Sequence, residues 1–145
     1  MNDSAAVWKD AERGEVSIYT SFFAFAEVFK VKCVDPGKPL TEENDKAIEQ
    51  IFRQPWIKPV VVDERIGVAA RRLMRHHPTC KKPADAIHLA TALALNVDEM
   101  HTFDGSDLLG LDGKVNRADG KPLKICRPKS VPKAPKEPSL FEEVP

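Results

Sequence analysis

The chain has 145 residues, 42% of them hydrophobic, and its 22 basic and 22 acidic residues cancel at pH 7. This length and composition suit one globular domain with a real core, and the balanced charge excludes binding to nucleic acid or membranes through net charge alone. Three widely spaced cysteines argue against a disulfide framework. No apolar run reaches the roughly 20 residues of a membrane span, and no signal-peptide core is present, so a cytoplasmic protein without membrane contact is expected.

The first quarter of the chain has the pattern helix, strand, helix. We expect a helix over residues 1–14, closed by a glycine, and a short strand over residues 16–20. Ser21 can cap the following helix, which is rich in phenylalanine and contains one carboxylate, Glu27. A carboxylate among phenylalanines is costly to bury unless it is paired or bound to a metal ion.

The middle of the chain continues this alternation. Helices are expected over residues 41–52 and 63–75, and Val60–Val62 is a β-branched run typical of a strand buried on both faces. Strands that alternate with helices predict an α/β fold with a mostly parallel sheet. Ligands of such sheets bind outside the carboxyl ends of the strands.

The most distinctive stretch begins at Pro83, which suits the first position of a helix, and Asn96 can adopt the left-handed conformation that ends one. Apolar residues between them recur at helical spacing. A strand is then expected over residues 100–103. Two carboxylates therefore flank this unit, Asp85 in the first helical turn and Asp104 at the exit of the strand.

The C-terminal part of the chain is expected to be an extended tail. Residues 123–126 suit an edge strand, and residues 128–145 contain five prolines and little apolar content. We therefore expect one domain over residues 1–127 and a disordered, proline-rich tail over residues 128–145.

Each acidic residue has an ordinary structural interpretation. Glu27 can point to water or pair with Lys30, and Asp85 suits the positive end of a helix dipole, worth about 0.3–1 kcal/mol. Asp104 precedes a glycine, as is common in turns, and Asp107 can cap the turn that follows it.

Three sequence runs together resemble the PIN domain family, the metal-dependent nuclease fold that includes VapC-like toxins of toxin–antitoxin pairs. The runs are Asp85–Ala92 (DAIHLATA), Thr102–Asp104 (TFD) and Tyr19–Val28 (YTSFFAFAEV). The first run is specific, whereas the second alone is weak. The resemblance covers most of residues 14–110.

This resemblance implies an α/β, three-layer fold with a mostly parallel central sheet flanked by helices. It also implies that Glu27, Asp85 and Asp104 hold Mg²⁺ or Mn²⁺ and catalyse hydrolysis of RNA, with Asp107 as a further candidate ligand. Carboxylates without clustered histidine or thiolate suit such hard cations. His88 is interpreted as packing or support for the acids. The implied partners are an RNA substrate, a cognate antitoxin and a second copy of the chain.

A basic run leads directly into this signature. Its cations are candidates for RNA binding, with an exposed helix face and basic loop as the alternative: Arg71, Arg72, Arg75, Lys81 and Lys82. His76, His77 and Cys80 lack a fourth ligand for zinc, so a solvated loop is expected there.

One part of the family pattern has no match. PIN domains begin with a hydrophobic strand that ends in an aspartate, whereas Asp3 follows only two residues here. We therefore expect the first strand and its aspartate to be missing, which leaves the metal site and the sheet incomplete. The alternative function is a catalytically inactive PIN-like module that binds RNA or a protein partner.

Overall fold

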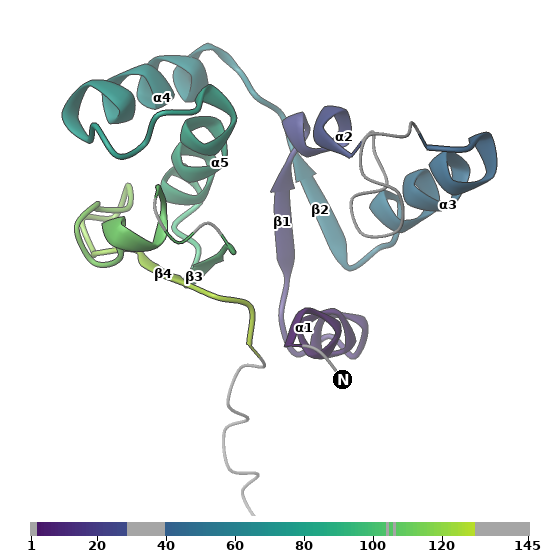
Figure 1. The fold of residues 1–145 in the computed structure, drawn as a ribbon. Helices are drawn as coiled ribbons and strands as arrows, with labels where there is room; N and C mark the ends of the chain where they lie inside the picture. The colour runs from purple at the N-terminus through teal and green to yellow at the C-terminus, as the bar shows by residue number, and fades with distance from the viewer. Residues whose placement is uncertain (1–2, 29–39, 104, 106, 130–145) are drawn as a thin grey trace, which may run out of the picture.

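The structure is a computed structural model, and it describes residues 3–28, 40–103, 105 and 107–129. None of its described helices has the length and apolar composition required to cross a bilayer. The elements follow one another in the order α1 Asp3–Glu12, β1 Ile18–Ser21, α2 Phe23–Glu27, α3 Glu42–Phe52, β2 Ile57–Val60, α4 Glu64–His76, α5 Pro83–Ala94, β3 Glu99–His101, the 3-10 turn η1 Leu109–Leu111 and β4 Lys124–Cys126 (Figure 1).

The four described strands form two sheets of two parallel strands each. β1 pairs with β2, with Ile18 opposite Ile57, and β3 pairs with β4, with Met100 opposite Ile125. The predicted α/β class with parallel strands is confirmed. In the described part of the chain β1 pairs only with β2 and β3 pairs only with β4, so the strands form two sheets and not the single central sheet that was expected.

The second strand lies earlier in the chain than predicted. The structure places β2 at Ile57–Val60, and Val61 is 67% exposed, so the predicted buried strand over Val60–Val62 is wrong. Pro59 lies within β2, opposite Thr20. An edge strand tolerates proline because its outer side needs no N–H donor.

The phenylalanine-rich helix is shorter and less buried than expected. Ser21 does not cap α2, since it ends β1, and the N-cap residue Phe22 makes no side-chain capping bond. None of the described residues of α2 is buried. Phe25 stacks on Phe52 of α3, with ring centroids 4.2 Å apart. The α2–α3 side of the molecule therefore contributes aromatic contacts and little core.

The hydrophobic core lies around α4 and α5. Asp63 caps α4 by accepting a hydrogen bond from the Ile66 backbone N–H at 3.1 Å. Cys80, expected in a solvated loop, is buried with the core. The buried cluster has no member from β1 or β2 and consists of Ile66, Ala70, Cys80, Ala86, Leu89, Ala90, Ala92, Leu108, Leu111, Val115, Leu123 and Ile125.

Both predicted ends of α5 are confirmed. Pro83 lies in its first turn, and Asn96 has a φ of 53°, in the left-handed region. The Asn96 side chain also accepts a hydrogen bond from the Asp119 backbone N–H at 2.8 Å, and Ala118 N–H donates to the Leu93 carbonyl at 2.9 Å. These bonds attach the segment before β4 to the C-terminal end of α5.

The burial of α5 in the core predicts a large loss of stability when one of its buried side chains is shortened. Leu89 is fully buried, so Leu89→Ala should lower the free energy of unfolding by about 2–5 kcal/mol. Leu95 is 38% exposed, and Leu95→Ala should change it by no more than about 0.5 kcal/mol. Urea unfolding followed by circular dichroism measures both values. Similar losses for the two variants would contradict the placement of the core.

Candidate functional site

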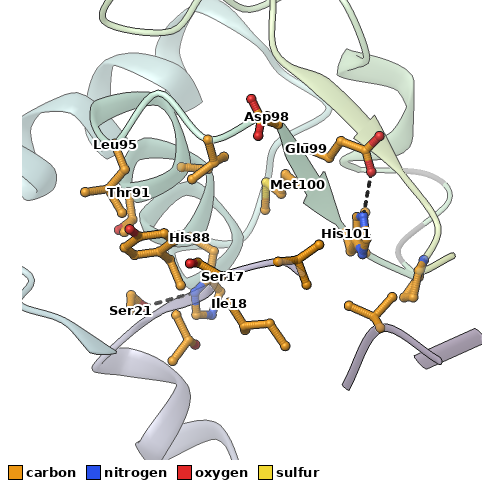
Figure 2. Close-up of a pocket in the computed structure, with 18 of the residues that line it drawn as sticks. Ser17, Ile18, Ser21, His88, Thr91, Leu95, Asp98, Glu99, Met100 and His101 are labelled. Carbon is orange, nitrogen blue, oxygen red and sulfur yellow. Dashed lines mark hydrogen bonds and ion pairs between the residues drawn. The ribbon is translucent and has the colours of Figure 1, made fainter. Parts of the chain in front are cut away.

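A cavity of about 930 Å³ lies between the two sheets. One wall consists of residues 17–21 along β1 and another of residues 98–102 along β3. A third comes from α5 and the two residues after it, and consists of Asp85, His88, Thr91, Ala92, Leu95 and Asn96. Figure 2 shows His88 and Thr91 of α5 and its C-cap residue Leu95 on one side of this cavity, and Asp98, Glu99 and Met100 on another.

His88 connects three elements at the end of β1. Its Nδ1 atom lies 3.0 Å from the Ser21 hydroxyl, a contact drawn as a dashed line in Figure 2, and its Nε2 atom contacts a carboxylate oxygen of Glu27. Ser21 is buried, and Glu27 is the last residue of α2. His88 therefore fixes the Glu27 carboxylate relative to α5. Lys30, the alternative partner of Glu27, lies outside the described residues.

Asp85 lies in the first turn of α5, one turn before His88. The N-cap residue Lys82 makes no side-chain capping bond there, and Asp85 is the acid of this first turn. Both Asp85 and His88 line the cavity, and the Oδ2 atom of Asp85 is buried. Their spacing of three residues places them on the same face of the helix. The structure thus brings Asp85, His88 and Glu27 onto adjoining elements.

The remaining predicted acids are only partly described. Asp104 lies outside the described residues, as does Ser106. Thr102 lines the cavity, and its backbone N–H donates to the Cys126 carbonyl at 2.9 Å. Asp107 is half-buried two residues beyond Gly105.

The structure assembles a second titratable group that the sequence did not predict. Glu99 accepts hydrogen bonds from His101 at 2.9 Å and from the Lys124 ammonium at 3.0 Å, and the Cys126 sulfur lies 3.7 Å from the same carboxylate. The donor atoms of Glu99, His101 and Cys126 lie within 4.8 Å of one another, and no other such trio occurs in the described part of the chain.

The charges of this group favour an ion-pair network. The hydrogen bond from His101, assisted by Lys124, lowers the pKa of Glu99 to about 2. Burial raises the pKa of the Cys126 thiol, and the Glu99 carboxylate adds to this effect. A metal ion would need the thiolate and would have to compete with Lys124 for Glu99. The arrangement of Glu99, His101, Lys124 and Cys126 therefore fits a salt-bridge network better than a metal site.

Alternation along a strand is the sequence signal that could have indicated this group. Glu99 and His101 lie two residues apart and so share one face of β3. The sequence does not reveal that β4 pairs with β3 in the register that brings Cys126 opposite His101. That register is a tertiary property.

The five basic candidates lie on the surface and do not line the cavity between the sheets. All are exposed: Arg71, Arg72 and Arg75 on α4, and Lys81 and Lys82 in the loop before α5. Arg72 borders a second cavity of about 320 Å³ together with His76, His77 and Arg117. The structure is therefore compatible with both alternatives, an RNA-binding surface and an exposed helix face.

The acids have the donor chemistry of a magnesium or manganese site, because carboxylate oxygens are the ligands these ions prefer. Asp85 and Glu27 project from α5 and α2, which are in contact. One Glu27 oxygen is engaged by His88, so it would have to be shared with, or released to, an ion. The described acids therefore offer the kind of ligand atom that the implied Mg²⁺ or Mn²⁺ ion requires.

Comparison with known proteins gives one match. The sequence model of the PIN domain family matches residues 2–108, which include Glu27, Asp85 and the strands β1, β2 and β3. No curated protein and no solved structure matches the chain.

The Glu99 network predicts a pH-dependent contribution to stability. The folded pKa of Glu99 is depressed from 4.5 to about 2, so its stabilisation is complete above pH 4.5 and is lost as the pH falls toward 2. Glu99→Gln should lower the free energy of unfolding at pH 7 by about 1–3 kcal/mol, and the difference from the unmodified chain should shrink at pH 2.

Urea unfolding at pH 7, 4 and 2 measures this effect. Glu43→Gln, on the exposed surface of α3, is the matched control and should lower the free energy of unfolding by less than about 1 kcal/mol, the loss of a helix-dipole contact. A Glu99→Gln loss that is the same at every pH would contradict the network.

Proposed function

Because the chain belongs to the PIN domain family, we propose that it is a metal-dependent endoribonuclease of the VapC-like toxin kind, or a close relative. The family indicates nuclease activity in general. The observation that carries the finer proposal is the contact of His88 with Ser21 and Glu27 at the carboxyl end of β1, with Asp85 one turn before His88 on the same helix. This edge is where parallel sheets bind their ligands.

In this proposal Asp85, Glu27 and Asp104 hold Mg²⁺ or Mn²⁺, with Asp107 as a further candidate. The ion would supply a Lewis acid for the phosphate and lower the pKa of a bound water. His88 acts as a positioning residue, since it holds Glu27 through one ring nitrogen while Ser21 holds the other. Such supporting contacts fix the direction of a ligand carboxylate before substrate arrives.

The basic surface would guide RNA toward these acids. Lys82 is the N-cap residue of α5, and Asp85 follows it within the first helical turn. The exposed cations of α4 and the loop therefore lie next in the chain to an acid of the site. Phosphate contacts from lysine and arginine give affinity that depends on salt and little on sequence.

We further propose a homodimer, a cognate antitoxin and a cytoplasmic location. Support for protein partners comes from large apolar side chains on the surface of the β1–α2–α3 side, which include Tyr19, Phe22, Phe23, Phe25 and Ile51. Grouped exposed apolar side chains are typical of protein interfaces.

Cleavage of RNA tests the nuclease proposal. The full chain with Mn²⁺ should cleave a mixed-sequence single-stranded RNA, and EDTA should abolish cleavage. Asp85→Asn and Asp104→Asn should each reduce the rate by at least about 100-fold. Asp45→Asn, in the first turn of α3, is the control and should cleave normally. Unchanged cleavage by both site variants would refute the assignment.

An inactive binding module is the second candidate function. It is favoured by the contact of His88 that occupies one carboxylate oxygen of Glu27. It is also consistent with the expectation that the family's first strand and its aspartate are missing; the first element described is the helix α1.

This candidate predicts RNA binding that persists in EDTA and weakens with salt. Replacing Arg71, Arg72 and Arg75 together by alanine should flatten the salt dependence, because each phosphate that is no longer neutralised reduces the slope by about 0.7 on a single strand. Fluorescence anisotropy at several salt concentrations measures the slope. The triple variant Lys9→Ala, Lys46→Ala, Lys114→Ala, at exposed positions elsewhere, is the charge-matched control. An equal effect of both triple variants would contradict a specific basic surface.

A further inference from the structure

The second cavity lies between α4, α5 and the segment before β4. Its volume is about 320 Å³, within the range of about 300–1,000 Å³ that small-molecule sites occupy. α5 lines it with Ala90, Leu93 and Ala94, whereas the same helix lines the cavity between the sheets with a separate set that includes Asp85 and His88. Helical spacing places these two sets on different faces of α5. The second cavity is therefore distinct from the candidate metal site.

The least exposed side chains of this cavity form an apolar floor. Ala90 is buried, and Ala69, Leu73 and Leu93 are half-buried. Alanine side chains end at Cβ, so Ala69 and Ala90 leave space where α4 and α5 pack against each other. A flat or apolar part of a ligand would lose contact with water against this floor, which favours binding.

Cationic and hydrogen-bonding side chains border the floor. Arg72 and His76 are exposed, and His77 is half-buried. The described lining of the cavity contains no aspartate or glutamate. The sequence has no acid between Glu64 and Asp85, so no counter-charge lies beside Arg72 along its own helix. This border therefore attracts an anion.

Arg117 forms part of the wall and is not a free cation. Its guanidinium donates to the Asp119 carboxylate and, at 3.0 Å, to the Val97 carbonyl. These bonds hold residues 116–118 against the chain that follows α5, so the wall is in place before a ligand binds. Asn116 is exposed on this wall, and its amide offers both donors and an acceptor to a ligand.

An apolar floor beside cations is complementary to a nucleotide. Single-stranded RNA is recognised through bases that leave the stack and lie against histidine, arginine or aromatic side chains. Arg71 and Arg75 are exposed on α4 next to Arg72 in the sequence, so positive charge continues beyond the cavity. A ligand with a negative charge on every unit, such as RNA, fits this surface better than a peptide with one or two acids.

We propose that the second cavity holds one unstacked base of a single-stranded RNA, with the phosphate of that nucleotide on Arg72. The proposal rests on the proposed function only in taking RNA as the ligand. It adds a base-binding site away from the acids, whose wall at residues 116–118 lies beyond the residues 2–108 that match the family model. RNA affinity then depends on a base as well as on phosphate charge.

Binding of short RNAs in EDTA tests the proposal without cleavage. The probes are a random-sequence pool of hexaribonucleotides and a chain of six abasic ribose phosphates, which carries the same backbone charge. The full chain should bind the pool at least about tenfold more tightly than the abasic chain, because burying one base contributes about this much. Fluorescence anisotropy at one fixed salt concentration measures both affinities.

A pair of variants assigns the effect of the base to this cavity. Ala118 is exposed and lines the cavity, so Ala118→Leu should narrow it without changing the charge or the fold. Its affinity for the pool should fall about tenfold, toward that for the abasic chain, whose own binding should stay the same. Ala47 is exposed on α3 and does not line this cavity, so Ala47→Leu is the matched control and should bind both probes like the unmodified chain.

Several results would overturn the proposal. They are no binding of the pool, equal affinities for the pool and the abasic chain, and equal affinities of the two leucine variants for the pool. Competition by a peptide of alternating glutamate and leucine that is at least as strong as that by RNA would make a polypeptide the ligand. Base-dependent binding by a chain that does not cleave RNA would refute the nuclease proposal alone, so the two failures are distinguishable.

Discussion

The packing of α5 is the interaction on which the rest of the structure depends. One side of this helix buries Ala86, Leu89 and Ala90 in the core shared with α4. Another side holds β1 and α2 through the contacts of His88 with Ser21 and Glu27. Its C-terminal end holds the segment that leads into β4. Both sheets are thus attached to one helix.

This arrangement makes the candidate site an assembly of two unequal halves. The α4–α5–β3–β4 half contains the described core cluster, whereas the β1–β2 half contributes no member to it. Asp85 comes from the first half and Glu27 from the second. Because His88 of α5 contacts both Ser21 and Glu27, the position of Glu27 relative to Asp85 depends on how β1 and α2 pack on α5.

Local signals in the sequence predicted α5 and the position of Asp85 well. Pro83 and Asn96 act on their own backbone, so the two ends of the helix could be predicted without knowledge of tertiary structure. The predicted position of β2 was wrong. The strand contains a proline, which is permitted only because β2 lies at a sheet edge, and the sequence alone does not reveal that position. The link from Ser21 through His88 to Glu27 joins residues more than 60 positions apart. The division into two sheets likewise depends on strand pairing over long distances.

Native-state hydrogen exchange of the unliganded chain tests the central role of α5 most directly. If α5 holds both sheets, amides of α4 and α5 should exchange only through openings that cost at least about 1 kcal/mol more than those of β1 and β2. The Leu89→Ala variant should lower the opening free energy in α5 and in both sheets. Protection in β1 and β2 that equals that of α5, or that is unaffected by Leu89→Ala, would contradict this role of the helix.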